Sequence, residues 1–523
     1  MVIKYVAGDG TGDWDADGEY DQVPINQALR WAHENPGNEV HLTGPFAFDI
    51  YTTVLIGSNT TFSGDSDAIL RLNDSCAWSS MVPVIGQIGG TGTVSKNIEI
   101  SGFQINCNEA NLYGVGGRIH GKGYYNAIHI QGQKANKASG INIHNLKIYN
   151  SMGDGARLVF CNDASVHDCE LWNLQHCSVF CIDSTNLDMY NNTIQAITCS
   201  GIRYDNCRNG IVRNNTITDW TGSTNAPKKG EHGVQIGNEP AKYGHTALTS
   251  NIEIYDNVIN VGGSGIQIED YLKTAGTKTQ AVDIHNNSIT GGNTNWASYF
   301  AGIAIYSWGN GITISKNTID GSARAGVLGY SAIASGVNVY VTSNNILNSV
   351  SAGSEGGYGI WNKTSALKII ANSNYLSGNV AGKYKGVNPG SESDSLIDDA
   401  VPGGPDVPDE PDEPDEPDEP VEPPNDPDYP EEPEEPDEPD EPYEPIEPVV
   451  PNPPTVGCKG FVIASDNGYI FQPFAASEVG DRILVVPVGS EYIILKLAEN
   501  IALGDNITML QDTKGNYYAI EGV

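Results

Sequence analysis

The sequence predicts an all-β protein whose main part is a parallel β-helix. Short segments such as "NNTIQAI", "NNTITDW" and "NNSITGG" recur, and each is followed by a Gly-apolar-x-apolar strand such as "SGIRYDN" or "SGIQIED". A repeat made of alternating strands without helical periodicity is expected to stack as the coils of a solenoid. A proline-rich acidic run after residue 405 and alternating segments near the C-terminus add a linker and a small β-barrel-like domain.

The coil length follows from one column of equivalent positions. Successive members at the start of the column are 23 residues apart, and later intervals are longer. At such corners asparagine tolerates left-handed backbone geometry, and stacked amides can bond from coil to coil, so we expect these residues to be scaffold. The predicted column is Leu146, Cys169, Asn192, Asn215, Asn257, Asn287, Asn317 and Asn345.

A helix is expected ahead of the first coils. In "VPINQALRWAHENPG" the apolar residues Ile25, Leu29 and Ala32 recur at helical spacing. A helix there would cap the end of the solenoid, which otherwise presents unpaired strand edges. We therefore expect a β-helix domain with its cap over residues 1–395, a linker over 396–455, and an all-β domain over 456–523.

The segment "DWDADGEYD" predicts a calcium loop. Its acidic residues follow the order of oxygen ligands in an EF-hand loop through nine positions, but the twelfth position is Pro24 in place of the bidentate glutamate. The segment is therefore expected to bind calcium without the EF-hand fold, and a solvated acidic turn is the alternative. The predicted ligands are Asp13, Asp15, Asp17, Glu19 and Asp21.

Charge argues against nucleic acid as a partner, and composition argues against a membrane-spanning segment. The formal net charge is -37, and residues 405–454 hold 22 of the 65 acidic residues and no Lys or Arg, so the rest is only moderately acidic. Nucleic acid, which requires a basic surface, is not expected as a partner. No apolar stretch approaches the length of a membrane span, so no transmembrane segment is expected.

Nine cysteines are present, and six of them lie within one part of the repeat region. Their spacing suits neither a zinc ribbon nor a small disulfide scaffold, so they are expected to be stacked buried thiols, with the redox compartment open. The six are Cys161, Cys169, Cys177, Cys181, Cys199 and Cys207.

The linker and the C-terminal segment suggest an anchored protein. "PDEPDEPDEP" places proline at every third residue, which favours an extended polyproline II spacer. Segments such as "DRILVVPVGSEYIILKL" alternate apolar and polar residues around glycine-containing turns, as in a small barrel. We expect this domain to dock to a protein or surface partner.

Over residues 1 to about 380 the sequence resembles the right-handed parallel β-helix proteins of the pectate-lyase-like superfamily, through its "GDG" start, its "DQVPINQAL" helix and its "NNTI" coils. More narrowly, "VAGDGTGDWDADGEYDQVPINQAL", "EVHLTGPFAF" and "LIGSNTTFSGD" are similar to disaggregatase-type proteins of methanogenic archaea. That resemblance implies a right-handed coil and action on the polysaccharide coat that holds such cells together. It supplies no catalytic residues.

Solenoid geometry predicts a candidate site. Aligning Gly155, Cys177, Gly201, Gly233 and Gly265 stacks consecutive coils and gathers charged residues on one outer face, beside the long insertion between Asn215 and Asn257. A polar outer face without further function is the alternative. The expected patch is Asp154, Arg157, His176, Arg203, Asp205, His232 and Glu269.

Two mechanisms suit that patch, and the sequence leaves both open. In β-elimination from a uronate a cation would neutralise the sugar carboxylate while Arg203 or His176 removes the proton. In hydrolysis Asp205 would act with Glu269 or Asp154, and Asp205 and Glu269, two coils or about 9.6 Å apart along the axis, are closer to an inverting than to a retaining separation.

The sequence therefore predicts a polysaccharide lyase or a glycoside hydrolase that acts on an acidic extracellular polysaccharide, with calcium as cofactor. The alternative is a non-catalytic adhesin, such as a virion tail fibre, that binds glycan through the same face. Either protein would work outside the cell, at a cell surface or on a virion, and a homo-oligomer is compatible with both.

Overall fold

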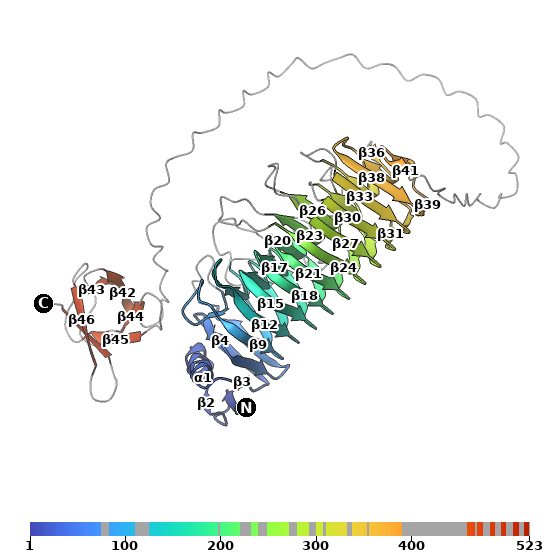
Figure 1. Cartoon of the computed structure of the whole chain (residues 1–523). Coiled ribbons are helices and arrows are strands. Elements are labelled where there is room, and N and C mark those ends of the chain that lie inside the picture. The colour runs from blue at the N-terminus through green and yellow to red at the C-terminus, as the bar shows by residue number, and fades with distance from the viewer. Residues whose placement is uncertain are drawn as a thin grey trace, which may run out of the picture. The chain divides into compact units, whose positions relative to one another are not determined.

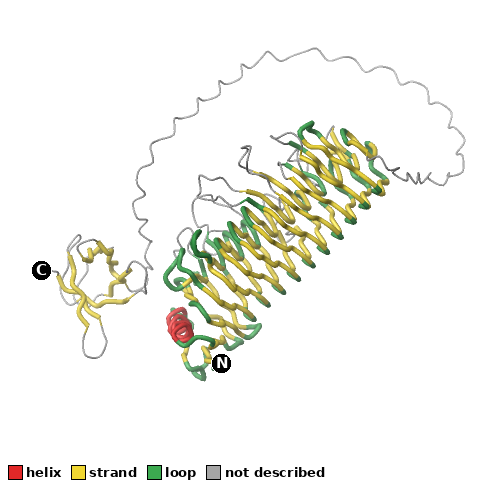
Figure 2. Tube along the Cα trace, viewed as in Figure 1, coloured by secondary structure: helices red, strands yellow, loops and turns green. Residues whose placement is uncertain are grey.

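A computed structural model of the chain describes residues 1–74, 83–109, 125–196, 199–219, 232–238, 248–270, 280–291, 300–306, 310–331, 337–352 and 355–389, and the backbone of six strands between 458 and 521. Up to residue 389 the described chain winds into a solenoid, in which each coil contributes one strand to each of three parallel sheets (Figures 1 and 2). The predicted fold class, a parallel β-helix, is confirmed. A connection between parallel strands turns right-handed in nearly all proteins.

The first sheet, sheet A, has 15 described strands, and sheets B and C have 12 each. The strands of sheet A are β2 (Trp14–Asp15), β1 (Ile3–Ala7), β3 (Asn38–Leu42), β6 (Thr60–Gly64), β9 (Lys96–Ser101), β12 (Ala138–His144), β15 (Cys161–His167), β18 (Thr185–Tyr190), β21 (Arg208–Arg213), β24 (Ser250–Tyr255), β27 (Gln280–His285), β30 (Asn310–Ser315), β33 (Val337–Thr342), β38 (Leu367–Asn372) and β41 (Asn388–Pro389). The strands of sheet B are β4 (Phe46–Ile50), β7 (Ala68–Leu72), β10 (Gln104–Asn106), β13 (Lys147–Ser151), β16 (Glu170–Leu174), β19 (Thr193–Ala196), β22 (Thr216–Asp219), β25 (Val258–Asn260), β28 (Ser288–Thr290), β31 (Thr318–Asp320), β34 (Asn345–Leu347) and β39 (Tyr375–Ser377). The strands of sheet C are β5 (Val54–Ile56), β8 (Ile85–Gln87), β11 (Ile128–Gln131), β14 (Ala156–Val159), β17 (Val179–Ile182), β20 (Ser200–Asp205), β23 (His232–Asn238), β26 (Ser264–Asp270), β29 (Ile303–Ile305), β32 (Ala325–Gly329), β37 (Tyr358–Asn362) and β40 (Gly382–Lys385). A short antiparallel pair, β35 (Ser351–Ala352) and β36 (Glu355–Gly356), lies beside the last coils.

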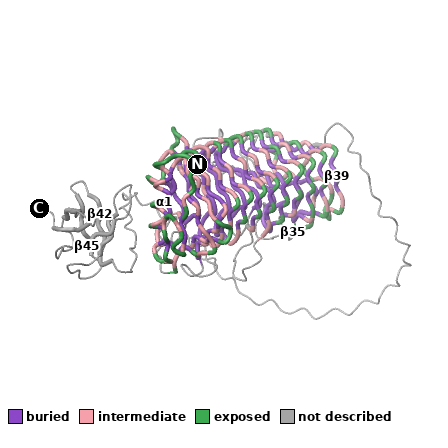
Figure 3. The backbone as a smooth tube through the Cα atoms, turned by 90° about the horizontal axis from the view of Figure 1, so that it is seen from below, coloured by how far each residue is buried: buried purple, intermediate pink, exposed green. Residues whose placement is uncertain are grey.

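The core runs along the inside of the coils. In sheets A and B the strands alternate one residue inward and one outward, so that, for example, Ile252 and Ile254 of β24 are buried. Successive coils place the same residue type in register, as Ile254, Ile284 and Ile314 do. The buried positions follow the length of the solenoid (Figure 3). Each apolar side chain is therefore covered by its own coil and by the coils on either side.

An asparagine ladder stabilises one corner of the coils. In each member the backbone N–H and Nδ2 donate to Oδ1 of the next, as Asn215 does to Asn257 at 3.0 Å. The members are Asn192, Asn215, Asn257, Asn287, Asn317, Asn344 and Asn374. The expected scaffold role is confirmed, but the predicted Asn345 was wrong by one residue, because its side chain points outward and Asn344 is buried. The left-handed backbone geometry belongs to the residue before each ladder asparagine, for example Asn214 at φ 54°.

The N-terminal helix α1 (Gln22–Glu34) forms as predicted. Its buried face includes Ile25, Ala28, Leu29 and Ala32, which belong to the same core cluster as the first coils. The helix contacts β3, β5 and β6 at the N-terminal end of the solenoid (Figure 1). It thus covers strand edges and apolar side chains that would otherwise meet water.

A column of glycines sets the distance between sheets C and B. Gly201, Gly233 and Gly265 occupy inward positions on adjacent strands of sheet C. A Cβ at Gly265 would lie 2.3 Å from Ile289 Cγ2 in sheet B and 2.7 Å from the carbonyl oxygen of Gly302 on the next coil. Only glycine fits at these inward positions, which accounts for the repeated Gly-apolar-x-apolar pattern.

The C-terminal segment forms a closed six-stranded barrel of its own, in the order β42, β43, β46, β47, β45, β44. Its strands are β42 (Cys458–Ser465), β43 (Gly468–Pro473), β44 (Arg482–Val486), β45 (Ile493–Leu497), β46 (Asn506–Gln511) and β47 (Tyr517–Glu521). The expected small all-β module is confirmed. The acidic linker lies outside the described residues, and the three domain boundaries stay predictions.

Candidate functional site on sheet C

The candidate site lies on the outward side of five adjacent strands of sheet C, from β14 to β26. Inward residues of these strands, such as Ile202 and Tyr204, belong to the main core. The residues between them face away from that core in two columns. The first column is Arg157, Phe180, Arg203, Gln235 and Gln267, and the second is Val159, Ile182, Asp205, Gly237 and Glu269.

The predicted alignment was correct except on one coil. Gly155 is equivalent to Ser178 and not to Cys177, since Ala156 pairs with Val179. An alignment on Cys177 would put Val179 and Cys181 in the two columns, but the structure has Phe180 and Ile182 there. The backbone N–H of Cys177 donates to Asp154 Oδ1 at 3.0 Å, and His176 lies one residue earlier, at the corner.

The predicted patch is brought together, but it is not exposed. Arg157 keeps 16 % of its side chain accessible, and the others are buried. The buried members are Asp154 0 %, Asp205 0 %, His232 3 %, Arg203 7 %, Glu269 8 % and His176 9 %. The expected exposed face was therefore wrong: these side chains point away from the core, yet they are shielded from water. A second apolar cluster that includes Phe180, Ile182 and Cys199 lies beside them. Much of the neighbouring insertion lies outside the described residues.

Asp154 organises the first end of the site. Its Oδ1 is 2.6 Å from His176 Nδ1, and its Oδ2 accepts from Arg157 Nη1 at 3.0 Å. Burial opposes ionisation of Asp154, but the charge and hydrogen bond of His176, with Arg157, lower its pKa to about 2. Burial likewise opposes the charged imidazole, yet the Asp154 carboxylate raises the pKa of His176 to about 9. The pair is thus a buried carboxylate–imidazolium contact.

Two arginines enclose an aromatic ring at the centre of the site. The guanidinium carbons of Arg157 and Arg203 lie 4.8 and 4.7 Å from the centroid of the Phe180 ring. Arg203 Nη2 also lies 2.7 Å from Asp205 Oδ2. Both cations therefore have compensating partners, as buried charges require.

A carboxyl pair lies at the other end. Asp205 and Glu269 occupy equivalent positions on β20 and β26, with Gly237 of β23 between them. A Cβ at Gly237 would approach Asp205 Oδ1 to 2.8 Å, so the glycine leaves room for that carboxylate. Gln267 Nε2 donates to Glu269 Oε2 at 2.6 Å. The two carboxyl groups are held separately, one by an arginine and one by an amide.

His232, on β23, is a neutral group in the candidate site. Its ring packs edge-on against Phe300, with centroids 5.3 Å apart. Burial lowers the pKa of His232 to about 4; Cys199 opposes that shift and Arg203 adds to it. At neutral pH the imidazole is therefore uncharged.

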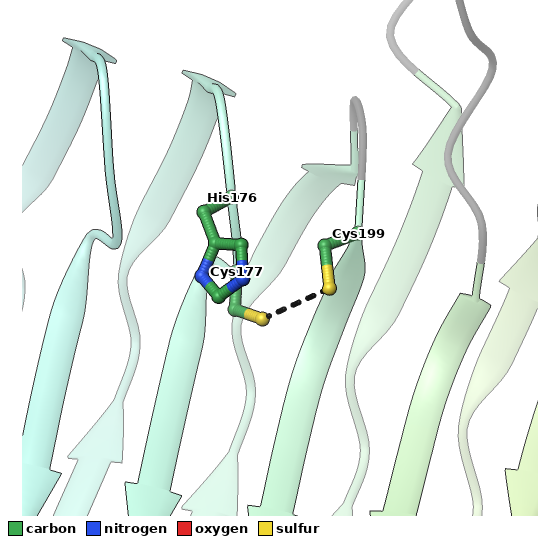
Figure 4. A group of neighbouring side chains, drawn as sticks. All are labelled: His176, Cys177 and Cys199. Atoms are coloured by element: carbon green, nitrogen blue, oxygen red, sulfur yellow. Dashed lines mark hydrogen bonds between the residues drawn. The ribbon is translucent and has the colours of Figure 1, made fainter. Parts of the chain in front are cut away.

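Two cysteines that were expected to be structural thiols lie in the candidate site. All six repeat-region cysteines are buried and free, as predicted. Cys177 and Cys199, however, lie beside His176 with their sulfurs 3.5 Å apart (Figure 4). The signal was present in the sequence as a His-Cys pair followed by a cysteine about one coil later, but only the correct register reveals the contact.

The predicted calcium segment does not form a converging loop. Trp14–Asp15 is strand β2, beside β1, and Asp13 contacts Lys4 Nζ at 2.5 Å. Asp21 is buried just before α1, and its carboxylate accepts from the backbone N–H groups of Asp17, Gly18 and Asp49. Asp13 and Asp21 thus have partners within the chain. Calcium binding by Asp13, Asp15, Asp17, Glu19 and Asp21 stays a prediction.

Two family models match parts of the chain. A model described as "Right handed beta helix region" matches residues 86–241 and 126–319, and a model described as "Disaggregatase related" matches residues 249–401. The fold and the first family model together identify the class of this protein as the right-handed parallel β-helix proteins. The second model confirms the narrower resemblance to disaggregatase-type proteins, in a part of the chain that the N-terminal motifs do not cover.

Several solved structures are similar to this chain. The A-module of the mannuronan C-5 epimerase AlgE6 from Azotobacter vinelandii shares 14 % identity, with a TM-score of 0.48 over 72 % of this chain and 97 % of the module. An exopolygalacturonase from Thermotoga maritima shares 9 % identity, with a TM-score of 0.42 over 68 % and 88 %. PfbA, a surface adhesin of Streptococcus pneumoniae, shares 13 % identity, with a TM-score of 0.42 over 73 % and 91 %.

A comparison with curated protein sequences found no match. Within the described part of the chain, no helix combines the length and the apolar character that a membrane crossing requires.

Proposed function

We propose that this protein binds and hydrolyses an acidic extracellular polysaccharide. The observation that carries the proposal is the carboxyl pair of Asp205 and Glu269, at equivalent positions two strands apart with only Gly237 between them. Two strand spacings correspond to about 9.6 Å, which falls near the separation of inverting glycosidases. Buried ionisable groups with perturbed pKa values, gathered on one side of one sheet, also favour a functional site.

In this mechanism the two carboxyl groups have different roles. Asp205, whose negative charge pairs with Arg203, accepts the proton of the attacking water, which requires that binding of the polysaccharide admit water to this buried carboxylate. Glu269, whose neighbour is the neutral amide of Gln267, donates a proton to the departing glycosidic oxygen. The guanidinium groups of Arg157 and Arg203 add positive charge to the row, which favours a sugar that carries a carboxylate.

Elimination is less well supported, because the bases it would use are engaged. Arg203 contacts both Asp205 and Phe180. His176 Nδ1 is bonded to Asp154, and the pKa of His176 is raised to about 9 mainly by that carboxylate against the effect of burial, so the imidazole holds its proton at neutral pH.

The second candidate, an adhesin that binds glycan on this face without cleaving it, needs no catalytic group.

The test is incubation of the full chain with a uronate-rich cell-coat polysaccharide. We expect new reducing ends without unsaturated products, and the first product anomer seen by NMR should be inverted. Glu269→Gln, which keeps an acceptor for Gln267, should lower the rate by at least about 100-fold. Asp188→Asn, a similar change on the outward side of sheet A, is the matched control and should keep full activity.

Other outcomes distinguish the alternatives. Unsaturated products would replace hydrolysis by elimination, and binding without any cleavage would support the adhesin. A substrate of this kind lies outside cells, so we place the protein in the extracellular space, on a cell surface or on a virion. The C-terminal barrel remains proposed as the docking domain.

A further inference from the structure

Three ligand-type side chains meet at one corner of the candidate site. His176, Cys177 and Cys199 each offer one nitrogen or sulfur atom, and these atoms all lie within 4.8 Å of one another (Figure 4). The two sulfurs are 3.5 Å apart, on neighbouring coils. In the residues the structure describes, no fourth His, Cys, Asp or Glu joins this group.

The histidine is oriented as in a metal site. Asp154 Oδ1 holds Nδ1 of His176 at 2.6 Å, and the imidazole also forms a hydrogen bond with Cys199, a second member of the group. The same oxygen accepts the backbone N–H of Cys177 at 3.0 Å, so Asp154 fixes two of the three residues at once. A carboxylate behind a histidine is the usual outer-shell partner of a metal-bound imidazole.

The other cysteines of the repeat differ from this pair. Cys207 Sγ donates to the backbone carbonyl oxygens of Cys181 and Asp205 at 3.3 and 3.2 Å. Cys169 Sγ likewise donates to the carbonyl of His167 at 3.2 Å. Such thiols satisfy backbone groups inside the coil. The sulfurs of Cys177 and Cys199 instead contact side chains, namely each other, the Ser200 hydroxyl, the Arg203 guanidinium and the His176 imidazole.

Charge balance favours a divalent ion. A metal ion displaces the protons of the two thiols and one proton of the His176 imidazolium. The two thiolates and the neutral imidazole that result cancel the charge of a divalent cation, so the occupied site adds no net charge to a buried region. Arg203 Nη1, 3.9 Å from Cys199 Sγ, can donate to a metal-bound thiolate. Asp154 and Asp205 balance the charges of Arg157 and Arg203.

We propose that His176, Cys177 and Cys199 bind one zinc ion, or another divalent ion that prefers sulfur and nitrogen, and that Asp154 orients the histidine. Sulfur ligands select zinc over calcium or magnesium. Three protein ligands leave a fourth position for water. The ion joins two successive coils at the end of the row opposite the Asp205 and Glu269 carboxyl pair. This inference is independent of hydrolysis.

The experiment uses the full chain, freed of metal with a chelator under reducing conditions and titrated with Co²⁺. We expect about one equivalent to bind, with sulfur-to-cobalt charge-transfer bands in the near ultraviolet and intense visible bands of four-coordinate cobalt. Zn²⁺ should bleach these bands. Cys177→Ser and Cys199→Ser should lose them, whereas the matched control Cys169→Ser should keep them. Asp154→Asn should weaken Zn²⁺ binding by roughly 10- to 100-fold.

Other results would overturn the inference. One is a reduced, folded chain without charge-transfer bands, and another is bands that persist in both serine variants. A chain that is isolated with a Cys177–Cys199 disulfide and takes up no metal after reduction would identify a redox pair. If a serine variant fails to fold, X-ray absorption at the zinc edge of the unmodified chain decides. Two sulfur neighbours at about 2.3 Å support the site, and none excludes it.

Discussion

Single asparagines at one corner of the coil are expected to contribute more to stability than their neighbours. Asn344 Nδ2 donates to the carbonyl oxygens of Ile314 and Thr342 and to Asn374 Oδ1, all within 3.0 Å, and its Oδ1 accepts from Asn317. Asn344→Ala leaves these buried groups unsatisfied. We expect a loss of about 3 to 5 kcal/mol in the free energy of unfolding, measured by urea denaturation.

The adjacent residue provides the control. Asn345 begins β34, and its side chain is exposed. Asn345→Ala should change the free energy of unfolding by less than about 1 kcal/mol. Equal losses in the two variants would contradict the ladder.

His129 should make stability depend on pH. Its side chain on β11 is 4 % exposed, and burial, with the charge of Arg157, lowers its pKa to about 4 against the opposing effect of Asp154. The unfolded chain takes up this proton near pH 6.5, before the folded chain does. The contribution of neutral His129 to the free energy of unfolding is therefore fully present above pH 6.5 and is lost as the pH falls toward 4.

The comparison uses His129→Asn. Between pH 7 and pH 4 the unmodified chain should lose about 3 kcal/mol more than the variant in the free energy of unfolding. The difference between the two chains removes the contribution of the many carboxyl groups, which both share. Parallel pH profiles would show that folding does not lower the pKa of His129.

At this scale the sequence predicted residue types better than their surroundings. The ladder role of asparagine and most outward positions of sheet C followed from the repeat. The contact of Cys177 with Cys199 did not, because the assumed alignment was one residue off on that coil. The coil length of 23 residues, applied strictly from Gly155, would have placed Ser178 in the column.

Among the elements, the glycine column of sheet C should tolerate no side chain. In Gly265→Ala the new Cβ would meet Ile289 Cγ2 and the carbonyl oxygen of Gly302. We expect a loss of about 2 to 3 kcal/mol in the free energy of unfolding from this overpacking. The measurement is again urea denaturation, with circular dichroism to verify the fold.

A double-mutant cycle identifies the cause. Ile289→Ala removes the methyl group that the new Cβ meets, so the double variant should lose at least about 1 kcal/mol less than the sum of the single changes. Gly265→Ala combined with Ile85→Ala, at a buried position of another coil, should be additive. Additivity in both pairs would mean that the clash with Ile289 is not the source of the loss.

Elements with a strong period were predictable, whereas the hydrogen bonds within and around the acidic N-terminal segment were not. Helix α1 and the coil strands follow from side-chain spacing alone. "DWDADGEYD" has the order of a calcium loop, but Trp14–Asp15 pairs with β1 and Asp21 bonds to three backbone N–H groups. A linear motif does not record such tertiary hydrogen bonds, and calcium binding by this segment stays a prediction.

For the whole molecule, charge should slow the approach of an acidic polysaccharide. The chain carries a formal net charge of -37, so substrate and protein repel each other at long range. Raising the ionic strength from about 0.02 to 0.2 M shortens the Debye length and should raise kcat/KM by roughly two- to tenfold. Most charge-steered enzymes show the opposite trend.

The control is a carboxyl-reduced, neutral form of the same polysaccharide. Its cleavage or binding should change little with salt, since it carries no charge to screen. A fall in kcat/KM with salt on the acidic substrate would mean that the arginines of sheet C, and not the overall charge, govern association.

At the same scale, the burial of the candidate site was beyond the sequence. Alternation along β20 correctly placed Arg203 and Asp205 away from the core, and outward positions on a solenoid are normally wet. Here the outward side of sheet C packs a second apolar cluster around Phe180. The repeat pattern records only which residues point outward, and it does not specify which outward positions are buried.

The asparagine ladder also governs where the protein can change. Successive ladder asparagines are 23, 42, 30, 30, 27 and 30 residues apart in the sequence, yet each lies at the same corner of its coil. Differences in coil length are therefore accommodated away from the asparagine corner. Insertions and deletions elsewhere in a coil can therefore change the surface of the protein without breaking the hydrogen-bonded row of asparagines.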